Sequence, residues 1–292
     1  MRASALYRTE AGRSFVLSLY RRKLENLTFP HDSRFVETRH GRTHVLMLGP
    51  KQAPPLIAIH GVNFAAPFMA DTIGPLAKHF RIYIPDIIGQ PGLSAEMQPP
   101  PAAHGYAGWL ADVLDQLSLG AVAMMGVSFG GAVVLDLAAT APSRISKAVL
   151  VVPAGFNVAT APMALLLRLF LPWHAHRLWP DMVPIAAAVR PLAWEMDAEQ
   201  YSYFDAILRH VRWLILPPGP FTTSDLEAFV APTALFAARQ DIFFPGDTLV
   251  AEARTVIPRL VEAHVFDSSH FPTSAMLAGV MERTQHFLTQ DL

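Results

Sequence analysis

Residues 126–131 read Gly-Val-Ser-Phe-Gly-Gly and connect an apolar run, residues 121–125, to a helical pattern, residues 129–139. A serine on so tight a strand-to-helix turn takes a strained backbone conformation that exposes its hydroxyl, and the flanking glycines let neighbouring backbone pass without a Cβ clash. The helix that starts there also directs unpaired N–H groups toward developing negative charge. The pattern therefore predicts that Ser128 is a nucleophile.

Outward from this turn, short apolar runs alternate with longer helical patterns, which is typical of strand–helix–strand units and a parallel sheet. Strands buried on both faces should be continuously apolar, and the runs from residue 56 onward are. We predict an α/β fold with a mostly parallel central sheet of about eight strands flanked by helices. The predicted strands are residues 34–38, 43–48, 56–59, 81–84, 121–125, 148–152, 233–237 and 261–266, with the first two paired as an antiparallel hairpin, and the predicted helices are residues 106–117, 129–139, 247–257 and 274–288.

Residues 8–27 predict an amphipathic leading helix. Its apolar side chains should face the body of the protein, and its basic ones should face outward. The inward residues are Phe15, Leu19 and Tyr20, and the outward ones are Arg21, Arg22 and Lys23.

Between Pro153 and Val230 the alternating rhythm breaks into helical pieces separated by prolines. Because this segment interrupts the strand–helix pattern, we predict an inserted helical cap. The expected organisation is a leading helix at 1–33, a core at 34–153 and 231–292, and a cap at 154–230. The cap would carry four of the five tryptophans, namely Trp173, Trp179, Trp194 and Trp213, and an apolar stripe of Leu165, Leu166, Leu167, Leu169 and Phe170 that either closes over an apolar group or packs within the cap.

Composition restricts the partners. The chain has 23 basic and 24 acidic side chains, so it has no long-range field to attract nucleic acid. Cysteine is absent, which leaves oxygen or nitrogen as the nucleophile. The apolar fraction of 52% and a mean hydropathy of +0.29 favour an apolar substrate or an oligomer, and a homodimer stays open.

The sequence shows no targeting or spanning segment. The apolar run 15–20 is short and lacks a small-residue cleavage site. Another, residues 161–171, is interrupted by Pro162 and Arg168 and falls short of the roughly 20 residues that cross a bilayer. We expect a cytoplasmic protein with no membrane span.

A second motif, His60-Gly61-Val62-Asn63, follows the predicted strand 56–59. Acyl transfer needs two N–H donors at the oxyanion, and losing one costs about 3 to 4 kcal/mol of transition-state stabilisation. The backbone N–H groups of Val62 and Phe129 are the candidates. We expect His60 to orient the loop rather than to act as the base.

Serine is inert until a neutral imidazole accepts its proton. His270 follows the last predicted strand across a short loop and is the candidate base. Asp241 follows the predicted strand 233–237, at the strand end where open α/β sheets place their sites, and is the candidate acid. Asp267 is a rival acid, but it lies three residues from the histidine and needs an unusual bend.

His174 and His176 form a pair with metal-like spacing, but the sequence offers no third ligand. We therefore expect them on the cap surface and predict no metal site and no organic cofactor.

Together these motifs resemble the α/β-hydrolase superfamily from about Arg34 to the C-terminus, and they are similar to those of small bacterial carboxylesterases. The resemblance implies that Val62 and Phe129 form the oxyanion hole and that Asp86 is structural. The loop after His60 lacks the extra glycines of lipase-type and proline-iminopeptidase-type enzymes. The motifs that carry the resemblance are Pro54-Pro55-Leu56 through His60-Gly61, Pro85-Asp86-Ile87-Ile88-Gly89, the turn at 126–131 and Asp267-Ser268-Ser269-His270-Phe271-Pro272.

The predicted function is hydrolysis of a carboxylic ester of a small to medium apolar substrate through an acyl-enzyme, with Ser128, Asp241 and His270 as the triad. Ser128 excludes the aspartate-based mechanism of epoxide hydrolases and haloalkane dehalogenases. A lactonase or a carbon–carbon bond hydrolase with the same triad stays open. So does a hydrolase-like ligand-binding protein with vestigial catalysis.

Overall fold

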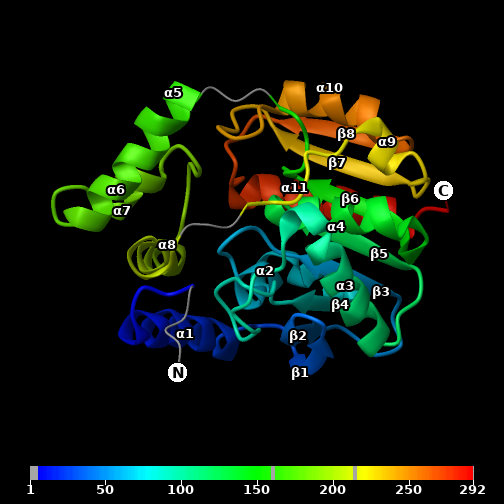
Figure 1. Ribbon diagram of the computed structural model, residues 1–292, viewed down its shortest axis with the longest axis horizontal. Helices are drawn as coiled ribbons and strands as arrows, with labels where there is room; N and C mark the ends of the chain where they lie inside the picture. Colours follow the sequence, from blue (N-terminus) through cyan, green and yellow to red (C-terminus); the bar gives the residue numbers. More distant parts are fainter. Residues whose placement is uncertain (1–5, 159–161, 213–215, 292) are drawn as a thin grey trace.

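The computed structural model describes residues 6–158, 162–212 and 216–291. Its centre is an eight-stranded sheet in the order β1-β2-β4-β3-β5-β6-β7-β8 (Figure 1). Strand β2 pairs antiparallel with β1 and β4, and the remaining pairs are parallel. The predicted mostly parallel sheet is therefore confirmed. The strands are β1 His31–Thr38, β2 Gly41–Leu48, β3 Pro55–Ile59, β4 Arg81–Pro85, β5 Val122–Val127, β6 Ile145–Val151, β7 Thr233–Ala238 and β8 Leu260–Phe266.

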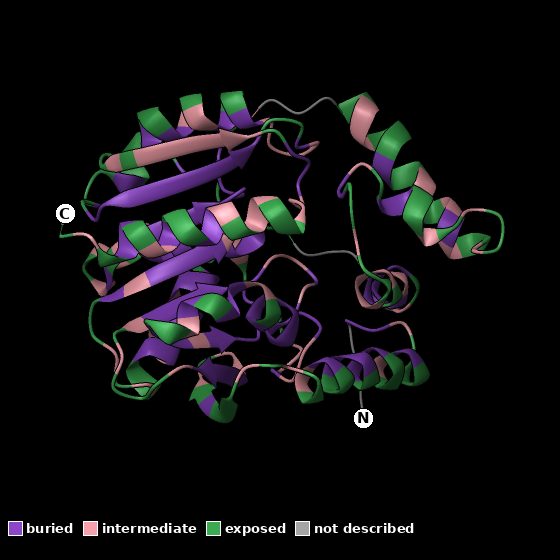
Figure 2. Cartoon of the chain, turned by 180° about the vertical axis from the view of Figure 1, so that it is seen from behind, coloured by how far each residue is buried: buried purple, intermediate pink, exposed green. Residues whose placement is uncertain are grey.

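Helices cover both faces of the sheet, because successive side chains of a strand point to opposite faces. On β3, Ile57 packs in one core with helices α3, α4 and α10, whereas Leu56 packs in the other with α2 and α11. Figure 2 shows the central strands buried between these layers. The helices are α2 Ala66–Ile73, α3 Gly105–Gln116, α4 Phe129–Thr140, α9 Thr223–Leu226, α10 Gly246–Val256 and α11 Ser274–Thr289, with short 3-10 turns at Gly74–Lys78, Pro101–Ala103 and Pro142–Arg144.

Two elements of the core differ from the sequence prediction. Helix α2 and the turn after it were not predicted. Strand β8 is half-buried rather than buried on both faces, because it is the edge strand next to β7.

The leading helix is α1, Glu10–Glu25, and Thr9 caps it by accepting the N–H of Gly12 at 3.0 Å. The prediction that Phe15 faces inward is wrong, because its side chain is 45% exposed and lies against the ring of His210. The prediction that Lys23 faces outward is also wrong. Lys23 shares the buried helix face with Leu19 and Tyr20, and two carboxylates there compensate its charge.

The segment between β6 and β7 forms the helices α5 Pro162–Leu165, α6 Leu171–Leu178, α7 Ile185–Val189 and α8 Ala198–His210, with a π-helical turn at Leu166–Phe170. In Figure 1 these helices lie apart from the sheet, on the side of α1 and α2. Helix α1 packs against α8 through Tyr20, Tyr203 and Ile207, so it joins this helical segment to α2 and the core.

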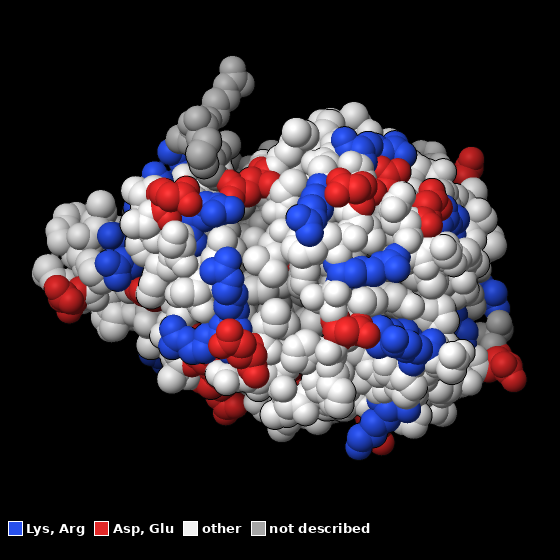
Figure 3. All heavy atoms as spheres, turned by 90° about the horizontal axis from the view of Figure 1, so that it is seen from below, with Lys and Arg blue, Asp and Glu red and all other residues white. Residues whose placement is uncertain are grey.

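Within the described residues, no helix is both long and apolar enough to span a membrane. On the face drawn in Figure 3, basic and acidic side chains are interspersed.

Candidate active site

The turn between β5 and α4 holds Ser128 in a conformation that side chains rarely adopt, with φ 51° and ψ −115°. Its N–H donates to the carbonyl of Val151 at 2.9 Å. A Cβ on Gly126 would lie 2.5 Å from the carbonyl oxygen of Gly130, and a Cβ on Gly130 would lie 2.2 Å from that of Ile59. Only glycine fits on both sides of the serine, which explains the spacing seen in the sequence.

The structure brings together the three predicted side chains. Ser128 Oγ lies 3.0 Å from Nε2 of His270, and Nδ1 of that ring lies 2.7 Å from Oδ2 of Asp241. The other oxygen of Asp241 accepts the N–H groups of Phe243 and Phe244 at 2.8 and 3.1 Å. This arrangement places a proton on Nδ1 of His270, so the lone pair on Nε2 can accept the serine proton.

His270 is buried among rings in the loop between β8 and α11. Phe243 and Phe271 meet the imidazole edge-on, with ring centroids at 5.2 and 5.4 Å. The N–H of Phe271 also donates to the carbonyl of Leu192 at 2.7 Å, which ties this loop to the segment between α7 and α8. Asp267, the rival acid, is exposed and accepts a hydrogen bond from Gln240 at 3.1 Å.

The loop after β3 passes close to the serine. A Cβ on Gly61 would lie 3.6 Å from Cβ of Ser128, and Val62 lines the same cavity as the serine. Phe129 is the first residue of α4, so its N–H has no acceptor within the helix. Both candidate oxyanion donors therefore belong to segments that adjoin Ser128.

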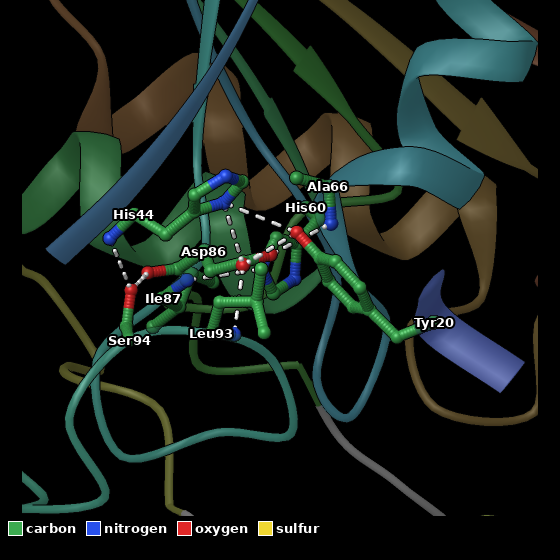
Figure 4. Close-up of polar contacts among 8 residues, drawn as sticks. All are labelled: Tyr20, His44, His60, Ala66, Asp86, Ile87, Leu93 and Ser94. Carbon is green, nitrogen blue, oxygen red and sulfur yellow. Dashed lines mark hydrogen bonds and ion pairs between the residues drawn. The ribbon is translucent and has the colours of Figure 1, made fainter. Parts of the chain in front are cut away.

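His60 uses both ring nitrogens to hold this loop, and Figure 4 shows its position beside Ile87 and Asp86. Its Nδ1–H donates to the carbonyl of Gly61 at 2.8 Å, and its Nε2 accepts the N–H of Ile87 at 3.0 Å. Burial lowers the pKa of His60, which keeps the ring neutral. Neither nitrogen is left to accept a proton from Ser128.

Asp86 is the centre of the network in Figure 4. It accepts the hydroxyl of Tyr20 at 2.8 Å and the N–H groups of Ala66 and Leu93, both at 3.0 Å, and lies 3.1 Å from Nδ1 of His44. Burial alone would raise the pKa of Asp86, but the hydrogen bond with His44, together with smaller contributions such as the N–H of Leu93, outweighs burial and lowers it. Because Ala66 begins α2, this carboxylate caps a helix that has no side-chain cap of its own.

The family resemblance implied that Asp86 is structural, but sequence reasoning missed Tyr20 and His44 as its partners. Tyr20 was expected to be buried, but nothing in its spacing indicated where the hydroxyl points. His44 lies in the middle of a predicted strand, and only the pairing of β2 with β4 brings it to Asp86.

Ser128 and His270 open into a cavity of about 410 Å³. Its walls are mostly apolar, and the helical segment contributes Trp173 and Phe204 to them. Besides Ser128 and His270, a few polar side chains also line the cavity, and Thr72 is one of them. The cavity is lined further by Phe64, Met69, Ile73, Met125, Val127, Val151, Val152, Leu192, Met196, Phe243, Phe271, Leu277 and Met281, with Glu195, Asp197, Gln200 and Ser274 as polar neighbours.

The apolar stripe of the predicted cap does not line this cavity. Leu166, Leu167 and Phe170 are exposed, and Leu169 packs against Trp173 inside the helical segment, with Leu165 beside that cluster. Of the predicted cap tryptophans, Trp179 and Trp194 are exposed, and Trp213 lies outside the described residues, as does residue 161.

His176 is buried rather than on the surface. Its ring contacts the carbonyl of Val183 at 2.7 Å and the carboxylate of Asp205 at 2.8 Å, while His174 is exposed. In the part of the chain that the structure describes, no group of three or more potential ligands could hold a metal ion.

Comparison with known proteins agrees with this architecture. A family model described as the alpha/beta hydrolase fold matches residues 54–179. The crystal structure of naproxen esterase (carboxylesterase NP) from Bacillus subtilis superimposes with a TM-score of 0.81, at 22% identity over 97% of this chain and 100% of that chain. The chain has the α/β-hydrolase fold. The predicted fold is thus confirmed.

Two sequence relatives extend this likeness. Carboxylesterase YbfK of Bacillus subtilis (strain 168) is 24% identical over 268 residues, which cover 87% of this chain and 86% of that protein. The predicted similarity to small bacterial carboxylesterases is confirmed. A 2-hydroxy-6-oxo-2,4-heptadienoate hydrolase of Pseudomonas putida is 33% identical over 109 residues, 35% of this chain and 38% of that protein.

Proposed function

We propose that this protein is a serine carboxylesterase that cleaves small to medium apolar esters through an acyl-enzyme. The observation that carries the proposal is the continuous hydrogen-bonded chain from Asp241 through His270 to Ser128, with distances of 2.7 and 3.0 Å, at the wall of an apolar cavity. Such a chain activates a serine hydroxyl at neutral pH without metal or organic cofactor.

In the acylation step, Ser128 Oγ attacks the ester carbonyl while its proton moves to Nε2 of His270. Asp241 offsets the positive charge that the ring gains. The N–H groups of Val62 and Phe129 stabilise the oxyanion. His270 then protonates the leaving alcohol and afterwards activates the water that releases the acid.

The substrate class follows from the cavity and the relatives. A volume of about 410 Å³ and a mostly apolar wall suit a small to medium acyl or alcohol group. The full-length likeness to carboxylesterase YbfK supports an ester as the scissile group.

Carbon–carbon bond hydrolysis is the second candidate, because the heptadienoate hydrolase is 33% identical over 35% of this chain. The same triad would catalyse this reaction. Turnover of a vinylogous diketone distinguishes carbon–carbon bond hydrolysis from ester hydrolysis.

The test uses a short-chain aryl ester and a fluorophosphonate probe on the wild type, Ser128→Ala, His270→Ala and the exposed control Ser143→Ala. We expect turnover and labelling in the wild type and control, both lost in Ser128→Ala, and turnover lost in His270→Ala. An active Ser128→Ala variant would refute the proposed nucleophile. Turnover of the diketone with none of any ester would replace the first candidate by the second.

A further inference from the structure

A second pocket shares one lining residue, Trp173, with the cavity at the candidate active site. Its volume is about 400 Å³, and three arginines line it from three separate segments. Arg8 precedes α1, Arg177 lies in α6, and Arg212 follows α8. The N–H of Arg8 donates to the carbonyl of His210 at 2.8 Å, which fixes the first segment against the end of α8.

In the part of the chain that the structure describes, no acidic side chain pairs with these arginines. Nearby Arg209, in contrast, pairs with Asp205 at 3.5 Å. Residues 1–5 and 213–215 lie outside the described residues, and their sequences, Met-Arg-Ala-Ser-Ala and Trp-Leu-Ile, contain no acidic residue. Three guanidinium groups therefore line one pocket, and no described carboxylate forms an ion pair with them.

The environment of Arg8 is suited to a bound anion. Burial, together with the positive charges of Arg177 and Arg212, lowers its pKa. Its Nε atom is buried and has no hydrogen-bond partner within the described part of the chain. A buried donor without a partner costs free energy, and so does the mutual repulsion of three cations. An anion in the pocket would relieve both.

The rest of the pocket is apolar. Phe170, Trp173 and Leu208 form this part, and exposed His174 lies at the pocket as well. Guanidinium groups match the planar geometry of a carboxylate and can bind it through paired hydrogen bonds. A ligand for this pocket thus needs a negative head and an apolar body.

We propose that this pocket binds a small amphiphilic carboxylate, with its head between Arg8, Arg177 and Arg212 and its chain against Phe170, Trp173 and Leu208. Trp173 also lines the cavity that contains Ser128, so an occupied pocket shares a wall with the candidate active site. The binding itself does not depend on the proposed esterase activity.

The test measures binding of octanoate and of its neutral analogue octanamide by titration calorimetry. The variants are Arg177→Gln, the triple variant Arg8→Gln/Arg177→Gln/Arg212→Gln, and Arg190→Gln as an exposed control outside the pocket. We expect octanoate to bind more tightly than octanamide. Its Kd should rise about tenfold in Arg177→Gln, further in the triple variant, and stay unchanged in Arg190→Gln.

The arginine variants separate this pocket from the cavity beside Ser128, because octanoate bound in that cavity would keep its Kd in the triple variant. Equal Kd values for octanoate and octanamide in the wild type would overturn the proposal, as would an unchanged octanoate Kd in the triple variant. Binding to anionic lipid vesicles without binding to free octanoate would overturn it in favour of a lipid surface. Unchanged circular dichroism of each variant keeps a loss of binding distinct from misfolding.

Discussion

Replacing Asp86 by asparagine tests how the loop beside Ser128 is held in place. The substitution keeps the shape of the side chain but turns one acceptor oxygen into an NH₂ donor. In the structure, Oδ1 accepts the N–H of Ala66, and Oδ2 accepts the hydroxyl of Tyr20 and the N–H of Leu93. Whichever way the amide is turned, its NH₂ group faces at least one buried donor.

The loss in the free energy of unfolding follows from these contacts. One unsatisfied buried N–H costs about 1–3 kcal/mol, and the remaining hydrogen bonds become weaker because the acceptor is no longer charged. We expect Asp86→Asn to lose about 2–4 kcal/mol. Because total stabilities are about 5–15 kcal/mol, the variant should still fold.

Activity should fall as well. Asp86 caps α2 through Ala66, and its neighbour Ile87 donates to His60, so both ends of the loop that contains Val62 are anchored here. Loss of one oxyanion donor costs about 3–4 kcal/mol, and a displaced donor costs part of that. We expect kcat on an aryl ester to fall about tenfold, with KM changed less.

Urea unfolding and ester kinetics measure the two effects, with Asp267→Asn as a control that removes the same charge from an exposed side chain. The pKa of Asp86 is lowered in the folded protein, so its stabilisation is present above the unfolded pKa of about 3.9 and is lost as pH falls below it. The stability difference between wild type and Asp86→Asn should therefore shrink in acid. Equal urea midpoints for Asp86→Asn and Asp267→Asn at about pH 7 would refute this reasoning.

Three further changes test other parts of the site. Asp241→Asn should lower kcat about 10³- to 10⁴-fold, because the imidazole loses its correct tautomer, while Asp267→Asn keeps activity; equal losses would contradict the assignment of the acid. Gly130→Ala should abolish folding or lower Tm sharply in a thermal melt, since its Cβ would lie 2.2 Å from the carbonyl oxygen of Ile59, and a wild-type Tm would argue against that contact. The pKa of His60 is lowered in the folded protein, so the unfolded chain binds a proton at this residue more readily, and the free energy of unfolding should fall as pH drops below about 6.5. His60→Gln should be less stable at every pH, but its free energy of unfolding should fall less over that range, as measured by urea titrations.

The strands could be predicted because each one is a short apolar run buried between two helical layers. Every predicted strand overlaps an observed one, with ends that differ by a few residues. The site could be located for a related reason. Ser128, Asp241 and His270 follow β5, β7 and β8, and parallel strands bring their carboxyl ends to one edge of the sheet.

What could not be predicted depends on contacts between distant parts of the chain. Helix α2 has no capping side chain at its N-terminus in the sequence. Its cap is Asp86, twenty residues after Ala66, so the start of the helix could not be recognised from neighbouring residues. Lys23 faces inward only because Asp71 and Glu199 lie at 2.9 and 2.8 Å from its ammonium group. Neither carboxylate is near Lys23 in the sequence, so charge alone indicated an outward position.

Similar long-range contacts connect the leading helix α1 to the segments around the candidate active site. Tyr20 of α1 donates to Asp86, which in turn caps α2, and α2 follows the loop that contains Val62. Helix α1 also packs against α8, which contributes Gln200 and Phe204 to the lining of the cavity. A helix that the sequence separates from the core thus packs against two helices, α2 and α8, that both contribute residues to the cavity beside Ser128.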